Sequence, residues 1–304
     1  AVRVHEYGGP DQLVLDEVAL PTPTAGEALV RVCAAGVGPW DALLRTGNSG
    51  LSQTLPLIPG SDIAGVVEAT GEEVYGVTNP SFAGGYAQYA TASRASIARK
   101  PSRLSFVEAA SVPVVAVTAW QLLFDHANVA AGQRVLVHGA AGNVGAYAVQ
   151  LARWAGAEVV ATAGSGDLGY VSTLGAEEVI DFQAQRFEEH ASAVDAVIDT
   201  VGGATQERSF SVIKPGGIIV SSVSPPAQTL AAKYGVRAEF FIVSVTSAQL
   251  ERIGGLIDDG VLQTDVGIVL DLTDARLAHE MLAGEVPHPR GKIVLRSTTS
   301  AAAI

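Results

Sequence analysis

The sequence predicts an α/β protein in which a doubly wound parallel sheet is joined to a second, β-rich domain. Three observations lead to this prediction. Short alternating runs fill residues 2–98, strands and helices alternate from about Val114 onward, and a glycine-spaced turn follows an apolar strand at 134–138. Because the chain has 304 residues, it is long enough for about two domains.

The first part of the chain is predicted to be mostly strand. Two strand-like runs flank the loop "PTPTAG", and "SDIAGVVEAT" and "GGYAQYATA" follow as further strands. The uncharged stretch 109–124 is too short to cross a bilayer and contains Pro113, so we expect a buried element there.

The second part has the alternation of strand and helix that is typical of right-handed crossover units. The last strand-like run, "GKIVL", is expected to rejoin the first part. We therefore assign residues 1–113 and 265–304 to one domain and residues 114–264 to the other. Parallel strands are expected at 134–138, 157–163, 177–180, 193–203, 214–222 and 237–244, with helices at 144–154 and 248–257 among those between and after them.

Composition excludes several classes of partner. The formal charge of −12 opposes binding to nucleic acid and to anionic membranes, because both need positive charge on the protein. No secretion signal is visible at the start, and the single cysteine, Cys33, excludes an internal disulfide and fits a reducing compartment. The 6 histidines show no metal-ligand spacing. We expect a cytoplasmic protein without nucleic-acid or membrane partners.

The turn "GAAGNVG" at 139–145 is predicted to hold the pyrophosphate of a dinucleotide. Glycines at such a turn let the backbone approach the phosphates and let the helix lie against the strand, while the helix start offers free amides. The spacing departs from the plain G-x-G-x-x-G form, since Ala140 stands at its first glycine. The predicted phosphate-binding residues are Ala140, Gly142, Asn143, Val144 and Gly145.

The end of the next strand predicts which dinucleotide binds. A site for NAD has an Asp or Glu about 20 residues beyond the glycines, which binds the ribose. Ala163, Gly164 and Ser165 stand there instead. We therefore predict NADPH, with Ser165 on the 2′-phosphate, although no Lys or Arg occurs between Arg153 and Arg186 to pair with that phosphate.

With these residues in view, the chain resembles the medium-chain dehydrogenase/reductase superfamily and, within it, the zinc-free, zeta-crystallin-like branch of quinone oxidoreductases. The resemblance covers nearly all the chain and implies that the β-rich domain is GroES-like and the other a Rossmann domain. It also implies a homodimer. The motifs that carry it, in order, are "EYGGPDQLVLDEV", "AAGVGPWDALLRTG", "LPLIPGSDIAGVVEA", "GGYAQYA", "EAASVPVVAVTAWQLL", "AGQRVLVHGAAGNVGAYAVQLA", "LGAEEVIDF" and "RGKIVL".

The resemblance also addresses zinc. Zinc alcohol dehydrogenases of this superfamily carry a ligand Cys and a ligand His followed by Glu, and Gly38, Ser61 and Asp62 stand at those three places. A catalytic zinc needs about three protein ligands, so we expect no metal site. Relatives carry a longer loop before "EVYG", and whether the chain is truly short after Gly71 is left open.

Without a metal, the natural reaction is hydride transfer from NADPH to a small electrophilic acceptor, a quinone or an α,β-unsaturated carbonyl. Two alternatives stay open: a crystallin-like protein that binds the cofactor with little turnover, and an enoyl thioester reductase. Many relatives have Asn at the place of Gly38 and Tyr at the place of Leu43, and the absence of both keeps the first alternative open.

The resemblance places further residues near the coenzyme or substrate. Asp41 matches a position beside the nicotinamide, but it also has the pattern of a helix N-cap. Trp40 is a candidate wall of an apolar cleft, or an ordinary core aromatic. Each remaining candidate also has a purely structural interpretation. Thr118 could be a buried helix hydroxyl and Val201 part of a turn after a strand. Phe241 and Val243 could be core-strand residues, and Lys292 a solvated charge.

Overall fold

The computed structural model describes residues 1–50 and 53–297. The chain divides into two compact units. Unit 1 comprises Ala1–Val114 together with the chain from Val245 onward, and unit 2 comprises Val115–Ser244. Each unit has its own buried apolar cluster, which is typical of separate domains. In the described part of the chain, no helix is long and apolar enough to cross a membrane.

Unit 2 is built on a parallel sheet. Its strands are β8 (Arg134–Val137), β9 (Glu158–Ala163), β10 (Glu178–Asp181), β11 (Val194–Asp199), β12 (Ile213–Ser221) and β13 (Arg237–Phe240). They lie in the order β10-β9-β8-β11-β12-β13, with every neighbouring pair parallel. This order reverses direction between β8 and β11, as in dinucleotide-binding sheets. The predicted doubly wound parallel sheet is confirmed.

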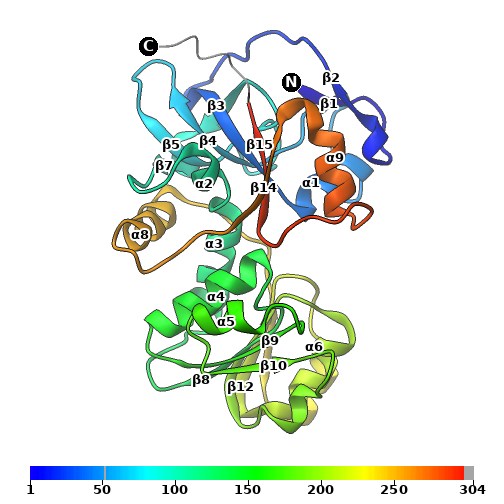
Figure 1. The fold of residues 1–304 in the computed structure, drawn as a ribbon, viewed down its shortest axis with the longest axis vertical. Helices are drawn as coiled ribbons and strands as arrows, with labels where there is room; N and C mark the ends of the chain where they lie inside the picture. The colour runs from blue at the N-terminus through cyan, green and yellow to red at the C-terminus, as the bar shows by residue number, and fades with distance from the viewer. Residues whose placement is uncertain (51–52, 298–304) are drawn as a thin grey trace. The chain divides into compact units, whose positions relative to one another are not determined.

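Helices connect these strands. Figure 1 shows α4 and α5 on one side of the sheet, as right-handed crossovers from β8 to β9 and from β9 to β10 require. The helices of unit 2 are α4 (Asn143–Trp154), α5 (Leu168–Thr173), α6 (Gly203–Ser209) and α7 (Gln228–Tyr234), with helical turns η3 (Gln121–His126), η4 (Phe187–Glu189) and η5 (Phe210–Val212); α3 (Pro113–Trp120) crosses the boundary between the units.

Unit 1 contains a mostly antiparallel main sheet and a separate two-stranded sheet made of its first two strands. Its strands are β1 (Val2–Val4), β2 (Leu13–Leu15), β3 (Glu27–Val37), β4 (Asp62–Val67), β5 (Glu73–Val77), β6 (Tyr89–Ser93), β7 (Ile97–Arg99), β14 (Val266–Asp271) and β15 (Lys292–Arg296). The main sheet has the order β14-β15-β3-β4-β5-β7, and β6 also pairs with β3. The last strand rejoins the first part as predicted, because β15 pairs with β3. The helices are α1 (Pro39–Thr46), α2 (Phe106–Ala110), α8 (Ser247–Asp258) and α9 (Ala275–Leu282), with turns η1 (Pro10–Gln12), η2 (Arg94–Ser96) and η6 (Leu272–Asp274).

The boundary after the parallel sheet differs from the prediction at residue 264. Helix α8 belongs to unit 1, since it packs against β7 and its Leu250 carbonyl accepts a 2.6 Å hydrogen bond from the Tyr75 hydroxyl. Its amphipathic spacing predicted a helix correctly but gave no sign of which core it covers. The predicted stretch 265–304 is described only as far as Ser297.

The end of β13 differs from the prediction, and the structure also shows how the chain runs after Gly71. Strand β13 ends at Phe240, so Phe241 and Val243 follow it in an irregular segment rather than in the predicted strand. This edge strand pairs only with β12, whose paired residues end at Ser221. The chain forms a tight turn at Gly71, whose amide donates to the Val67 carbonyl at 2.8 Å. The turn leads directly into β5.

Candidate functional site

The glycine turn of unit 2 has a backbone that its sequence explains. Gly139 has a φ of +66°, a conformation that side chains disfavour. A Cβ at Gly145 would lie 2.2 Å from the Gly139 carbonyl oxygen, so only glycine allows α4 to approach the turn this closely. Gly142 is the N-cap of α4 and brings no side chain over the first-turn amides. These are the properties that a pyrophosphate site requires.

The turn is also tied to the neighbouring strand. The Ala140 amide donates to the carbonyl of Thr162 in β9 at 3.0 Å, and the Gly142 amide donates to Gly139 at 2.9 Å. Asn143 is exposed and Val144 half-buried at the start of α4. The residues present therefore fit a dinucleotide pyrophosphate held by backbone amides, as predicted, and the individual assignments stay predictions.

Sequence reasoning missed His138, which lies directly before the turn and is fully buried. Its Nδ1 lies 3.0 Å from the Thr162 hydroxyl and its Nε2 lies 2.9 Å from the Ser209 hydroxyl. Ser209 donates its own proton to the Thr205 carbonyl at 2.7 Å, so it accepts from Nε2–H and His138 is the neutral Nε2–H tautomer. Burial lowers the pKa of His138 to about 4, which keeps it neutral.

The end of β11 lies beside the glycine turn. Asp199 is buried, and its Oδ1 accepts from the amides of Val201 at 3.0 Å and Gly202 at 2.8 Å. This carboxylate fixes the loop so that a Cβ at Gly139 would lie 3.0 Å from the Val201 Cγ2. Val201 is 49% exposed. The structure thus brings the predicted residue Val201 to the predicted phosphate loop.

The surroundings of Ser165 differ from the expectation. The Ser165 hydroxyl donates to the Asp181 carboxylate at 2.6 Å, and Asp181 ends the neighbouring strand β10. The premise that no carboxylate stands at this place is wrong. Because β9 and β10 are parallel and Asp181 pairs with Ala163, both strands end at the same edge of the sheet. In the sequence, Asp181 ends "EEVID", one strand later than the place where a ribose-binding carboxylate is expected.

In unit 1, Asp41 lies in the first turn of α1 and is 1% exposed. The predicted alternative that it is the N-cap is wrong, because Gly38 is the N-cap and Asp41 is the third residue of the helix. Its carboxylate accepts from the Gly38 amide at 2.8 Å and from the Gly60 amide at 2.9 Å. Burial raises the pKa of Asp41 to about 7, and the Gly38 bond, the nearby Lys292 and the Gly60 bond oppose this rise.

A directed chain of buried hydrogen bonds ends on Asp41. The Arg45 Nε donates to the His279 Nδ1 at 3.2 Å, so His279 carries its proton on Nε2, which lies 3.3 Å from the Tyr86 hydroxyl. Tyr86 in turn donates to Asp41 at 3.2 Å. Burial, and secondarily Arg45, lowers the pKa of His279 to about 3. The contacts of Asp41 that the structure shows are therefore those of a residue that positions α1.

Lys292 is buried rather than solvated. Its Nζ lies 3.1 Å from the Asp62 carboxylate, and both side chains are under 5% exposed. The same ammonium lies 3.3 Å from the point where a Cβ at Gly38 would be. Asp62 also accepts from the Val114 amide at 2.9 Å. The predicted contact of Lys292 with the coenzyme stays a prediction.

The remaining candidates have these positions. The Trp40 ring meets Phe82 edge to face with centroids 5.9 Å apart, and its buried Nε1 has no hydrogen-bond partner among residues 1–50 and 53–297. Thr118 is 5% exposed in α3. Phe241 stacks on His126 at 4.3 Å, and Val243 is half-buried. The roles predicted for these residues near the coenzyme stay predictions.

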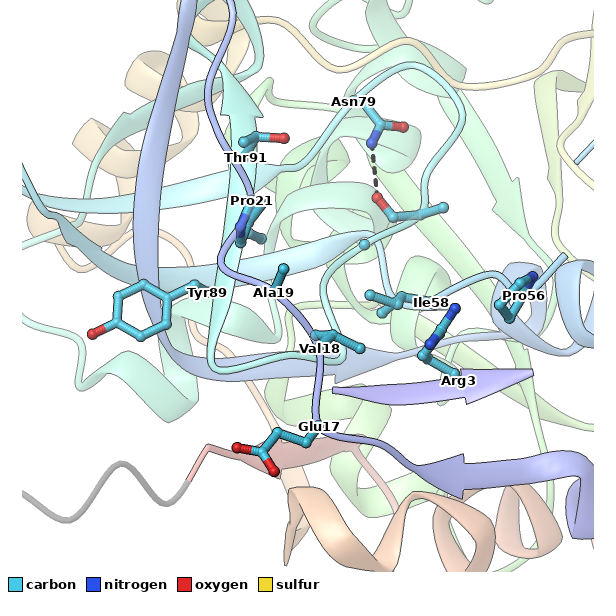
Figure 2. Close-up of a pocket in the computed structure, with 13 residues that line it drawn as sticks. Arg3, Glu17, Val18, Ala19, Pro21, Pro56, Ile58, Asn79, Tyr89 and Thr91 are labelled. Carbon is cyan, nitrogen blue, oxygen red and sulfur yellow. Dashed lines mark hydrogen bonds between the residues drawn. The ribbon is translucent and has the colours of Figure 1, made fainter. Parts of the chain in front are cut away.

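A separate surface cavity of about 520 Å³ lies in unit 1 and contains none of the predicted site residues. Figure 2 shows its wall, formed by the segment around Val18 and Ala19 with Ile58 and Tyr89. In the described residues, no three His, Cys, Asp or Glu side chains are grouped so that they could hold a metal ion.

Comparison with known proteins defines the class. Residues 24–102 match the alcohol dehydrogenase GroES-like domain family, and residues 174–295 match the family described as zinc-binding dehydrogenase. With the doubly wound sheet, these matches define a medium-chain dehydrogenase/reductase. The predicted GroES-like domain is thereby confirmed.

Individual relatives narrow this class. The quinone oxidoreductase of Sus scrofa is 31% identical over 96% of this chain and 94% of its own length. The solved quinone oxidoreductase of Coxiella burnetii has a TM-score of 0.89 at 32% identity, covering 97% of this chain and 98% of that one. A mycobacterial protein solved with NADPH has a TM-score of 0.86 at 27% identity, covering 97% and 99%. The chain belongs to the quinone oxidoreductase family, as the resemblance predicted, and is an oxidoreductase that uses a nicotinamide coenzyme.

Proposed function

We propose that this chain reduces quinones or α,β-unsaturated carbonyls with a nicotinamide coenzyme and without a catalytic zinc. The proposal rests on the three residues that stand where zinc alcohol dehydrogenases carry their zinc ligands. Gly38 and Ser61 offer no imidazole or thiolate, and Asp62 is engaged by the Lys292 ammonium at 3.1 Å. A fixed positive charge beside a carboxylate opposes cation binding at that place, because the two cations repel each other.

The reaction suits the residues that remain. The bound coenzyme supplies a hydride. A conjugated acceptor is electrophilic without a Lewis acid, so the protein is left to bind and orient it and to exclude water. The buried Trp40 Nε1 is a donor with no partner in the described chain, and we propose that it donates to the oxygen of a bound acceptor.

The predicted preference for NADPH has mixed support. The mycobacterial relative solved with NADPH favours it. The carboxylate of Asp181 at 2.6 Å from the Ser165 hydroxyl opposes it, because Ser165 was the residue expected on the 2′-phosphate. The proposal therefore covers both reduced coenzymes.

The test is a spectrophotometric assay of the purified chain with NADH and NADPH against quinones, enals, alkenyl ketones and simple aldehydes. We expect coenzyme oxidation with conjugated acceptors only, unchanged after treatment with a strong chelator. Reduction of simple aldehydes that is lost with the chelator and restored by zinc would contradict the proposal. Tight coenzyme binding without reduction of any acceptor would instead support the crystallin-like alternative.

A further inference from the structure

We propose that this chain selects NADH over NADPH, and that the carboxylate of Asp181 makes the selection. The inference concerns the coenzyme site of the proposed function and rests on it. In other dinucleotide sites the ribose-binding carboxylate ends the second strand of the sheet. The inference assigns this role to Asp181, which ends the third strand instead.

The position of Asp181 follows from sheet geometry. Ser165 stands 20 residues after Gly145, in the loop that follows β9, where a dinucleotide sheet binds the adenosine ribose. Asp181 is in register with Ala163, the last residue of β9. The neighbouring strand therefore delivers a carboxylate to the place where the end of β9 offers only Ala163, Gly164 and Ser165.

The hydrogen bonds at this edge leave acceptors for a ligand. The Ser165 hydroxyl donates to Asp181 at 2.6 Å, the Ser165 amide donates to the Gln183 Oε1 at 3.0 Å, and the Gln183 amide donates to Asp181 at 2.9 Å. Both donors of Ser165 are thus already committed to acceptors. A ribose diol can donate to this carboxylate, whereas a 2′-phosphate has only acceptor oxygens to offer.

The local charges act in the same direction. The hydrogen bonds from Ser165 and from the Gln183 amide lower the pKa of Asp181, so its carboxylate is ionised at neutral pH. No Lys or Arg occurs between Arg153 and Arg186. Arg153 is paired with Glu177 at 2.6 Å and Arg186 with Glu188 at 3.5 Å. A 2′-phosphate would meet a negative charge, and the segment between Arg153 and Arg186 supplies no Lys or Arg to pair with it.

The test measures coenzyme binding directly, by titrating the nicotinamide fluorescence of NADH and NADPH with the purified chain. We expect the unmodified chain to bind NADH at least about tenfold more tightly than NADPH, since repulsion between a carboxylate and a phosphate a few ångströms apart is of this order. Asp181→Asn should tighten NADPH binding by about tenfold and weaken NADH binding. Glu189→Gln, which removes an exposed charge from the same unit, should leave both affinities unchanged.

Salt separates charge repulsion from a structural effect. In the unmodified chain, raising the ionic strength should reduce the difference in affinity between NADH and NADPH, because salt screens the repulsion between the Asp181 carboxylate and the 2′-phosphate. In Asp181→Asn this repulsion is absent, so salt should have little effect on the difference. Thermal unfolding of each variant shows whether it is folded. If Asp181→Asn has a folding defect, Asp181→Ser serves as the second variant.

The outcomes distinguish this inference from the proposed function. Tighter binding of NADPH by the unmodified chain, or an unchanged NADH to NADPH ratio in folded Asp181 variants, overturns the inference and leaves quinone reduction intact. Tight NADH binding without reduction of any acceptor supports the inference and contradicts the proposed function. Binding of neither coenzyme overturns both.

Discussion

Gly145 shows how far a single residue determines the coenzyme site. Its role was predictable from sequence, because a glycine at this spacing after an apolar strand is where helix and turn approach each other. The structure adds the magnitude: a Cβ would lie 2.2 Å from the Gly139 carbonyl oxygen and 2.8 Å from the Ala140 Cα, both backbone atoms that cannot move alone. Gly142 has more room, since a Cβ there meets only the Gly139 oxygen at 3.2 Å.

We predict that Gly145→Ala weakens coenzyme binding at least about tenfold and lowers the free energy of unfolding by about 1–3 kcal/mol, the usual cost of an overpacked site. Fluorescence titration and urea unfolding measure the two effects. The control is Gly169→Ala in α5, where a Cβ meets nothing within 4 Å. That variant should bind coenzyme normally, and an equal loss in both variants would refute the steric explanation.

Other residues could not be assigned from sequence alone. Asp41 fitted both an N-cap and a coenzyme contact, and only the helix start at Pro39 made Gly38 the N-cap. His138 carried no signal, because its partners Thr162 and Ser209 are 24 and 71 positions away. Such contacts depend on how strands pair, which a local pattern does not specify.

At the scale of elements, strand pairing creates a deeply buried charge pair in unit 1. Lys292 begins β15 and Asp62 begins β4, 230 positions apart, and β3 lies between these two strands in the sheet. The sequence predicted that the last strand returns to the first part. It did not predict that the ammonium is buried, because a charge at the start of a strand is usually solvated.

We predict that Lys292→Met lowers the free energy of unfolding by about 3–5 kcal/mol, because it leaves the Asp62 carboxylate buried without its partner. The double variant Lys292→Met with Asp62→Asn should recover part of this loss. Urea unfolding provides the measurement. Arg296→Met in the same strand is the matched control, since the Arg296–Asp271 pair is exposed and worth at most about 1 kcal/mol. Equal losses at positions 292 and 296 would argue against the buried pair.

At the scale of the whole molecule, each unit contains a buried neutral histidine, and these two groups shape how stability depends on pH. The pKa is lowered to about 4 for His138 and to about 3 for His279. Below its unfolded pKa of about 6.5, each histidine binds a proton in the unfolded chain but not in the folded chain. Their stabilising contribution is therefore present above about pH 6.5 and is lost as the pH falls. Asp41, with its pKa raised to about 7, acts in the opposite direction over this range.

We predict that the free energy of unfolding falls between about pH 6.5 and about pH 5, and that His138→Gln makes this fall shallower by about 1.4 kcal/mol per pH unit, the contribution of one proton. Urea unfolding at several pH values gives both slopes. His288→Gln, at an exposed histidine, serves as the control and should keep the original slope. Identical slopes for the unmodified chain and His138→Gln would mean that His138 is protonated in the folded state.

The predicted homodimer and the predicted cytoplasmic location concern the molecule as a whole and stay predictions. Sedimentation analysis of the purified chain measures its association state directly.

The sequence by itself determined the two-domain organisation, the doubly wound sheet and the glycine turn, because apolar periodicity and glycine spacing are local properties of the chain. Tertiary structure alone decided which core α8 covers, that Lys292 is buried, and that Asp181 reaches Ser165. These depend on which strands lie side by side and in what register, and residues far apart in the sequence meet only after the sheet has formed. For the same reason we propose NADH in place of the predicted NADPH, because the carboxylate at this edge belongs to the adjacent strand.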